Sequence, residues 1–123
     1  MNAPRGEAIE HFVAKWQRRE PEMAQAEVFC PPALRPRYRA WGSLLHELRE
    51  AAFELSDPRV AEVKSQWWAE ELLGLAGGRS RHPVTAPLAG LPADWPALVH
   101  ALVALPAMPA RPGDTAAALA RLQ

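Results

Sequence analysis

Apolar residues recur at helical spacing along most of the chain, and no segment shows the alternation of apolar and polar positions that a strand requires. The clearest pattern predicts a helix that begins near Pro32 or Pro36 and ends near Leu55. Its apolar positions follow one another on one face: Leu34, Tyr38, Trp41, Leu45, Leu48, Ala52 and Leu55. We therefore expect an all-α fold in which this is one of the two longest helices.

The other long helix is predicted directly afterwards, over residues 58–76. Asp57 is a favourable N-cap and Pro58 a favourable first residue, while Gly77-Gly78 can end the helix in a left-handed conformation. Its apolar face consists of Val60, Val63, Trp67, Trp68, Leu72 and Leu75. Because the connection between the two helices is short, we expect them to form an antiparallel hairpin at the core of the fold.

Shorter helices are expected before and after the hairpin. A helix from Glu7 to Arg19 presents Ile9, Phe12, Val13 and Trp16, and Pro21 separates it from a short segment over residues 22–29. Pro83 can open a short helix to about Leu88, and Asp94 can cap another that carries Leu98, Val99, Leu102 and Val103. We assign residues 1–105 to one helical domain and residues 106–123 to a Pro-rich linker and the start of a further helix. Because no stop signal ends that last run, we expect the natural polypeptide to continue.

Composition limits the classes of function. The 123 residues suit one domain, and 14 basic residues balance 14 acidic ones, so that electrostatics gives no reason to expect nucleic acid as a partner. Cys30 is alone, which excludes an internal disulfide and favours a reducing compartment such as the cytoplasm. The N-terminus lacks the apolar region of a signal peptide, and no apolar stretch approaches the roughly 18 residues of a membrane span.

Three groups of polar and aromatic residues stand out in the region of the two long helices. The segment LLHELREAAFELSDP carries Glu47, Glu50 and Glu54. The segment KSQWWAEEL carries Lys64, Trp67, Trp68, Glu70 and Glu71. The loop RSRHPVT carries Arg79, Arg81 and His82, which make it the most basic part of the chain.

In this order, the acidic helix, the helix with paired tryptophans and the His-Pro-Val-Thr loop resemble the squalene/phytoene synthase family. The similarity extends from Phe29 to Leu91, about half of the chain. It implies part of an antiparallel helical bundle of isoprenoid-synthase type. It also implies the family's reaction, the head-to-head joining of two isoprenyl diphosphates by Mg²⁺ bound to two D-x-x-x-D motifs on facing helices.

The resemblance also suggests roles for individual residues. Glu50 and Glu54, with Glu47 one turn earlier, take the place of the first aspartate pair and are the candidate Mg²⁺ ligands. The candidate diphosphate-binding residues are Arg79, Arg81 and His82, and the candidate prenyl-chain contacts are Trp67 and Trp68. No catalytic residue is assigned, and Mg²⁺ and an isoprenyl diphosphate are expected only if the chain is active.

Two departures from the family pattern favour an inactive chain. Glutamates replace the aspartates, and no second acidic pair at this spacing follows within the sequence. We therefore expect that this chain does not transfer prenyl groups by itself. The alternative is a non-catalytic helical interaction or assembly protein on the same scaffold, and self-association through exposed apolar faces is then expected.

Plainer roles stay open for each group. The three glutamates lie about 150° around the helix from the apolar stripe, so that they form either a solvated face or an acidic patch over a cavity. Arg39 and Arg49 are available to pair with them. The tryptophans can serve in the core, whereas surface positions are the plainer interpretation of Lys64, Glu70, Glu71 and the basic loop.

Overall fold

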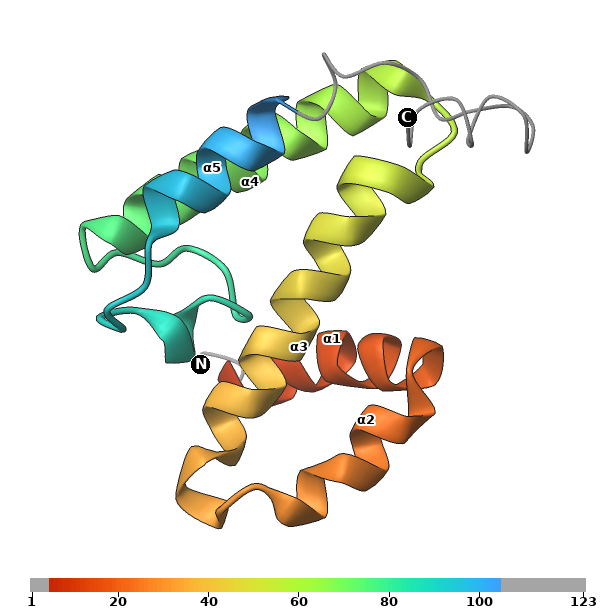
Figure 1. The fold of residues 1–123 in the computed structure, drawn as a ribbon, viewed down its shortest axis with the longest axis vertical. Coiled ribbons are helices and arrows are strands. Elements are labelled where there is room, and N and C mark those ends of the chain that lie inside the picture. The colour runs from red at the N-terminus through yellow and green to blue at the C-terminus, as the bar shows by residue number, and fades with distance from the viewer. Residues whose placement is uncertain (1–4, 105–123) are drawn as a thin grey trace, which may run out of the picture.

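The computed structural model describes residues 5–104, in which all regular structure is helical and no strand occurs (Figure 1). The α-helices are α1 (Arg5–Arg19), α2 (Pro21–Ala26), α3 (Arg35–Arg49), α4 (Pro58–Ala76) and α5 (Trp95–Ala104). Short 3₁₀ turns form η1 (Glu27–Phe29), η2 (Pro32–Leu34) and η4 (Ala86–Leu88), and a π-helical segment forms η3 (Glu50–Glu54). The all-α prediction is confirmed for this range, whereas the predicted linker and last helix lie outside the described residues.

The two ends of α4 follow from local signals. Asp57 caps the N-terminus, where its Oδ1 accepts a hydrogen bond of 2.9 Å from the backbone N–H of Arg59. At the other end Gly78 adopts a left-handed conformation with φ of +78°. The backbone N–H of Arg79 then donates to the carbonyl oxygen of Gly74 at 2.8 Å, which closes a Schellman motif. Both predicted ends of this helix are confirmed.

The predicted long helix before α4 consists of three consecutive pieces. Residues 32–34 form the 3₁₀ turn η2, α3 follows without a break, and its final turn widens into η3. A π-helix closes its hydrogen bonds over five residues instead of four, so side chains four positions apart are no longer stacked as they are in an α-helix. This change of pitch affects the spacing of Glu50 and Glu54.

The chain reverses direction between η3 and α4, but α3 and α4 diverge from this corner instead of packing along their length (Figure 1). The main packing partner of α4 is α5, and that of α3 is α1. Of the two consecutive elements α3 and η3, it is mainly η3, next to the corner, that approaches α4 closely. The predicted reversal is therefore present, but the prediction that the two long helices pack together as the core is wrong.

The core fills the wedge between α3 and α4. Its large members are Leu44, Leu48, Trp68, Leu72, Leu75, Val84, Leu88, Trp95 and Leu102. Val84 and Leu88 come from the segment between α4 and α5, and Trp41 of α3 stacks on Trp95 with ring centroids 5.4 Å apart. The segment after α4 therefore supplies the contacts that a direct α3–α4 seam would have made.

The predicted apolar faces are correct only in part. On α4, the second half of the face is buried as expected, but Val60, Val63 and Trp67 are exposed. Along α3 and η3, burial follows Ala40, Leu44, Leu48 and Ala51, whereas Leu45 of the predicted stripe faces solvent. The buried side of α3 is thus rotated from the predicted one, because both α1 and the segment after α4 pack on this helix.

Helix α1 lies close to α3 because Gly42 leaves room for an aromatic ring. Val13 and Trp16 are buried as predicted, and the Trp16 indole occupies the space that a Cβ on residue 42 would need. This contact places the last turns of α1, with Lys15 and Arg19, opposite the end of α3. Within residues 5–104, every helix is too short or too polar to cross a bilayer.

Candidate functional site

The first part of the site is an ion-pair cluster between α1 and the end of α3. Lys15 Nζ lies 3.1 Å from Glu47 Oε2 and 3.1 Å from Glu50 Oε2. Burial acts to lower the pKa of Lys15, but the hydrogen bonds and negative charges of the two glutamates outweigh it and raise the pKa above its usual value. Glu47 and Glu50 thus pair with α1 and are only partly exposed, so they do not form the fully solvated face that was one of the two expected arrangements.

Glu54 binds a different cation. Its carboxylate receives two hydrogen bonds from the Arg19 guanidinium, the shorter of them 2.6 Å between Nη2 and Oε1. Glu50 and Glu54 therefore do not share one cation, since Lys15 and Arg19, four residues apart on α1, each pair with one of them. The arginines expected to pair with the glutamates bind elsewhere, Arg39 to Glu27 and Glu10, and Arg49 to Glu20.

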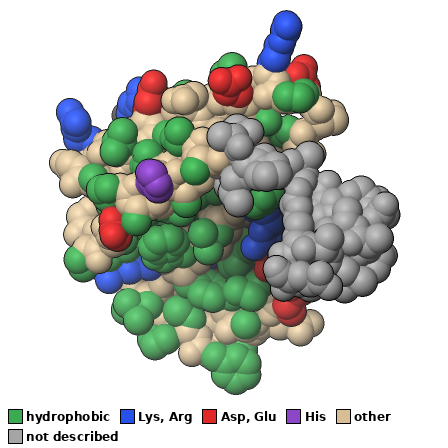
Figure 2. All heavy atoms as spheres, turned by 45° about the horizontal axis from the view of Figure 1, so that its top comes forward, with side chains coloured by type: hydrophobic (Ala, Val, Ile, Leu, Met, Phe, Trp, Pro, Cys, Tyr) green, Lys and Arg blue, Asp and Glu red, His purple; other side chains and the backbone are tan. Residues whose placement is uncertain are grey.

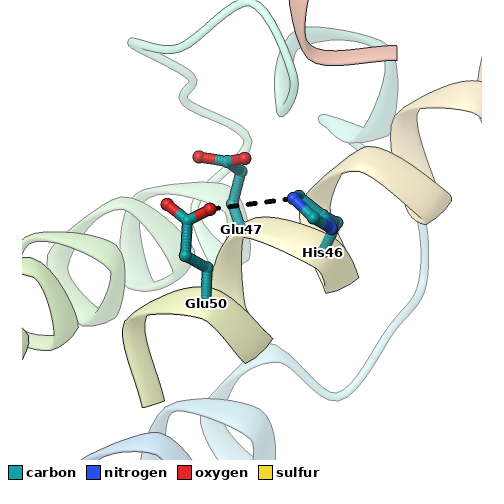
Figure 3. A group of neighbouring side chains, drawn as sticks. All are labelled: His46, Glu47 and Glu50. Carbon is teal, nitrogen blue, oxygen red and sulfur yellow. Dashed lines mark ion pairs between the residues drawn. The ribbon is translucent and has the colours of Figure 1, made fainter. Parts of the chain in front are cut away.

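His46 completes the cluster from within the helix. Its side chain is only 5% exposed, and its Nε2 makes no hydrogen bond to any described residue. This nitrogen lies 3.8 Å from Glu50 Oε2, and Figure 3 shows the ring directed toward that carboxylate. One ligand atom from each of His46, Glu47 and Glu50 can be chosen so that all lie within 4.8 Å of one another. Sequence reasoning missed His46, although its spacing of four residues from Glu50 was a usable signal.

A cavity of about 200 Å³ opens beside the two glutamates. It is lined by Glu47, Glu50, Lys64, Trp67 and Trp68, so two candidate metal ligands and both candidate prenyl contacts share one space. Trp68 is buried in the core, whereas Trp67 is partly exposed. The two indoles meet edge to face with centroids 5.0 Å apart.

The ring of His82 lies in an aromatic box. Its ring centroid is 4.7 Å from that of Phe12, 5.7 Å from Trp67 and 5.0 Å from Trp68. The Nδ1 atom accepts a hydrogen bond of 3.0 Å from the backbone N–H of Val84, which leaves the proton of the neutral ring on Nε2. Burial lowers the pKa of His82, against a partial opposing effect of nearby carboxylates. The imidazole is thus arranged as a neutral group.

Glu71 is the buried anchor of the loop after α4. It is 1% exposed and accepts three hydrogen bonds, from Thr85 Oγ1 at 2.6 Å, the Arg81 backbone N–H at 2.8 Å and Arg81 Nε at 3.2 Å. Burial alone would raise the pKa of Glu71, but these hydrogen bonds and the Arg81 charge hold it below its usual value. The interpretation of Glu71 as a surface charge is wrong, because this carboxylate fastens the loop to α4.

The three candidate residues of the basic loop do not line one common cavity. The charge of Arg81 is engaged by Glu71, and its guanidinium lies 5.7 Å from the centroid of the Trp67 ring. Arg79 and Arg81 line a cavity of about 350 Å³ together with Glu70 and Glu71, and His82 does not line it. A separate cavity of about 260 Å³ is lined by Arg81 and His82, together with Ser80, Pro83 and Ala86. Arg81 therefore shares one cavity with Arg79 and another with His82, and the diphosphate-binding role of the three residues stays a prediction.

A larger cavity, of about 470 Å³, was not anticipated from the sequence. Its lining is mostly apolar and proline-rich: Ile9, Glu10, Pro32, Arg35, Pro36, Arg39, Pro83, Ala86 and Pro87. Arg39 is already paired with Glu10 and Glu27, and Arg35 Nε donates to the carbonyl oxygen of Cys30 at 3.1 Å. The cationic groups at this cavity thus have partners within the chain.

Comparison of the chain with protein-family models, with curated proteins and with solved structures gives no match. The family resemblance therefore rests on the sequence motifs alone.

Proposed function

We propose that this chain is a non-catalytic helical protein related to the squalene/phytoene synthases, which acts by binding and not by prenyl transfer. The observation that carries the proposal is the separation of Glu50 from Glu54, each of which binds its own cation on α1. Mg²⁺ that activates a diphosphate needs carboxylate oxygens arranged around one position, with near-ideal octahedral geometry. A pair of glutamates divided between Lys15 and Arg19 does not offer that arrangement.

The size of the cavity supports the same proposal. At about 200 Å³, the space beside Glu47, Glu50 and the tryptophans is below the usual 300–1,000 Å³ of small-molecule pockets. An isoprenyl diphosphate with a long chain needs more room than this. The shared position of acidic and tryptophan side chains favours a bundle of isoprenoid-synthase type, which remains part of the proposal, as does a cytoplasmic location on the basis of the lone Cys30.

Isothermal titration with a non-hydrolysable farnesyl diphosphate analogue, with and without Mg²⁺, tests the absence of prenyl-transfer chemistry. We expect no binding that depends on Mg²⁺, and no effect of the Glu50→Gln variant. Saturable binding that requires Mg²⁺ and disappears in Glu50→Gln would overturn the non-catalytic assignment.

An exposed apolar stripe on α4 supports binding as the activity. Val60, Val63 and Trp67 are spaced by three and four residues, so they lie along one side of the helix, and all three are exposed. The stripe is not labelled in Figure 2, which shows more generally that hydrophobic side chains also gather between charged ones on the face drawn there. We propose a second copy of the chain as the partner of the stripe, because a net charge of zero does not oppose self-association.

Sedimentation velocity over a range of concentrations tests self-association. We expect dimers that become monomers in Val63→Glu, since Val63 is 69% exposed and lies within the stripe. Val28→Glu is the matched control, because Val28 is 67% exposed but lies on η1, and this variant should still dimerise. A wild-type monomer at every concentration would remove the second copy as the partner.

A further inference from the structure

We infer that His46, Glu47 and Glu50 form a binding site for a divalent transition metal of the Zn²⁺ class, for which Lys15 is a built-in competitor. This inference goes beyond the proposed function, because it needs neither an isoprenyl ligand nor a second copy of the chain. It also differs from the Mg²⁺ pair implied by the family resemblance, since it includes His46 and leaves out Glu54.

The state of His46 is the first reason. Buried polar atoms are nearly always hydrogen-bonded, so an exception requires an explanation. Here the imidazole is 5% exposed, its Nε2 has no hydrogen-bond partner among the described residues, and it is directed toward Glu50 (Figure 3). A bound metal ion would give this nitrogen a partner, whereas Lys15, which has only protons to donate, is paired with the carboxylates.

The spacing of the three ligand atoms is the second reason. Atoms within 4.8 Å of one another enclose a point less than about 3 Å from each, while Zn²⁺ needs about 2.0–2.2 Å to nitrogen and carboxylate oxygen. Each side chain therefore has to move inward by less than about 1 Å. Rotation of the two glutamate side chains, which have several rotatable bonds, supplies most of that movement.

The donor set selects the class of metal. One imidazole nitrogen with two carboxylates suits Zn²⁺ and similar transition metals, whereas Mg²⁺ prefers oxygen ligands alone and retains its waters. Three protein ligands leave at least one coordination position open. Because Glu47 and Glu50 line the cavity of about 200 Å³, that position has room for a water molecule.

Lys15 explains how the carboxylates stay close together without a metal. Its ammonium lies 3.1 Å from an oxygen of each glutamate and neutralises part of their repulsion. The side chain is also partly exposed and flexible, so it can move into solvent when a divalent cation replaces it. Metal binding at this site is then an exchange of one cation for another.

Isothermal titration with ZnCl₂ tests the inference, in a Cys30→Ser background so that the thiol cannot bind the metal. We expect one Zn²⁺ per chain, and a loss of affinity of at least about tenfold in His46→Gln and Glu50→Gln. Lys15→Met should bind Zn²⁺ several-fold more tightly, because the competitor is removed. Glu54→Gln is the matched control on the same segment and should bind as the unsubstituted chain does.

A spectroscopic measurement keeps the test independent of whether His46→Gln folds. X-ray absorption of the Zn²⁺ complex with histidine intact should show one imidazole nitrogen among oxygen ligands. The inference is overturned by any of three results: no saturable Zn²⁺ binding, a first shell without imidazole, or equal losses in Glu54→Gln and Glu50→Gln. None of these titrations contains a diphosphate, so their outcome is independent of the test of the proposed function.

Discussion

Glu71 on α4 and Glu50 on η3 are both carboxylates of helical segments, yet their surroundings differ. Glu71 is almost fully buried, and three donors from the following loop satisfy it. Glu50 is partly exposed, shares Lys15 with Glu47, and faces the unsatisfied nitrogen of His46. One cluster is complete within the chain, whereas the other has an unused ligand atom.

The contrast separates a structural role from a candidate functional one. A buried carboxylate whose acceptor positions are filled holds two segments together and has little capacity for a further ligand. A partly exposed cluster with a buried nitrogen that has no hydrogen-bond partner can still bind a further ligand. The unpaired nitrogen costs stability, which a bound ligand can offset. We therefore expect substitutions at Glu71 to act on folding, and substitutions at Glu50 to act mainly on binding.

The largest expected effect is that of Glu71→Ala. It leaves the Arg81 backbone N–H without its acceptor, and the Thr85 hydroxyl keeps only the His82 carbonyl oxygen and the Ser80 hydroxyl as partners. The loop loses its attachment to α4, which should reduce the free energy of unfolding by about 2–4 kcal/mol. Urea denaturation followed by circular dichroism measures the change. Glu70→Ala is the matched control on the adjacent exposed position and should stay within about 0.5 kcal/mol. A loss in Glu71→Ala no larger than that in Glu70→Ala would contradict the structural role of Glu71.

A smaller loss is expected from Gly42→Ala, which tests how α1 brings Lys15 to the glutamates. The added methyl group would overlap the Trp16 indole and push the helices apart, at a cost of about 1–3 kcal/mol. Gly74→Ala meets only ordinary contacts near the end of α4 and should be neutral or stabilising by up to about 1 kcal/mol. Thermal and urea denaturation distinguish the two, and stabilisation by Gly42→Ala would show that the α1–α3 contact is loose.

His82, which lies between the clusters, should make stability depend on pH. Because its folded pKa lies below the unfolded value of about 6.5, the unfolded chain binds more protons near that pH. Stability is therefore complete above pH 6.5 and declines as the pH falls toward the folded pKa. Melting temperatures across pH 5–7.5 should show this decline in the wild type and a weaker slope in His82→Gln. Identical slopes would mean that the aromatic box does not disfavour the imidazolium.

The smallest effect is expected at the Arg19–Glu54 pair. Both side chains reach solvent, so Arg19→Ala should cost no more than about 0.5 kcal/mol, and less in high salt. Urea denaturation at low and high salt measures both quantities. A loss above 1.4 kcal/mol, about a tenfold change in the folding equilibrium, would place Glu54 in the same structural class as Glu71.

The sequence predicted features that depend on neighbouring residues. The Asp57 cap, the stop at Gly78 and the cap by Asp94, whose Oδ1 accepts from the Ala97 N–H at 3.0 Å, are all present. Each of these signals acts over a few residues, so the rest of the fold does not alter it.

Features that depend on distant segments were not predictable in the same way. Glu70 and Glu71 look alike in sequence, and only the loop that folds over α4 buries one of them. The i,i+4 spacing of Glu50 and Glu54 assumed a regular α-helix, which the π-helical segment does not provide. The grouping of the glutamates was predicted, but their pairing with Lys15 requires the position of α1.

The wedge between α3 and α4 has a consequence for the order of folding. The core that fills this wedge includes Val84, Leu88 and Trp95, which follow both long helices in the chain. A nascent chain that ends at Ala76 contains the residues of both long helices but lacks the side chains that pack between them. Burial of this surface as seen in the fold therefore requires synthesis to reach Leu102.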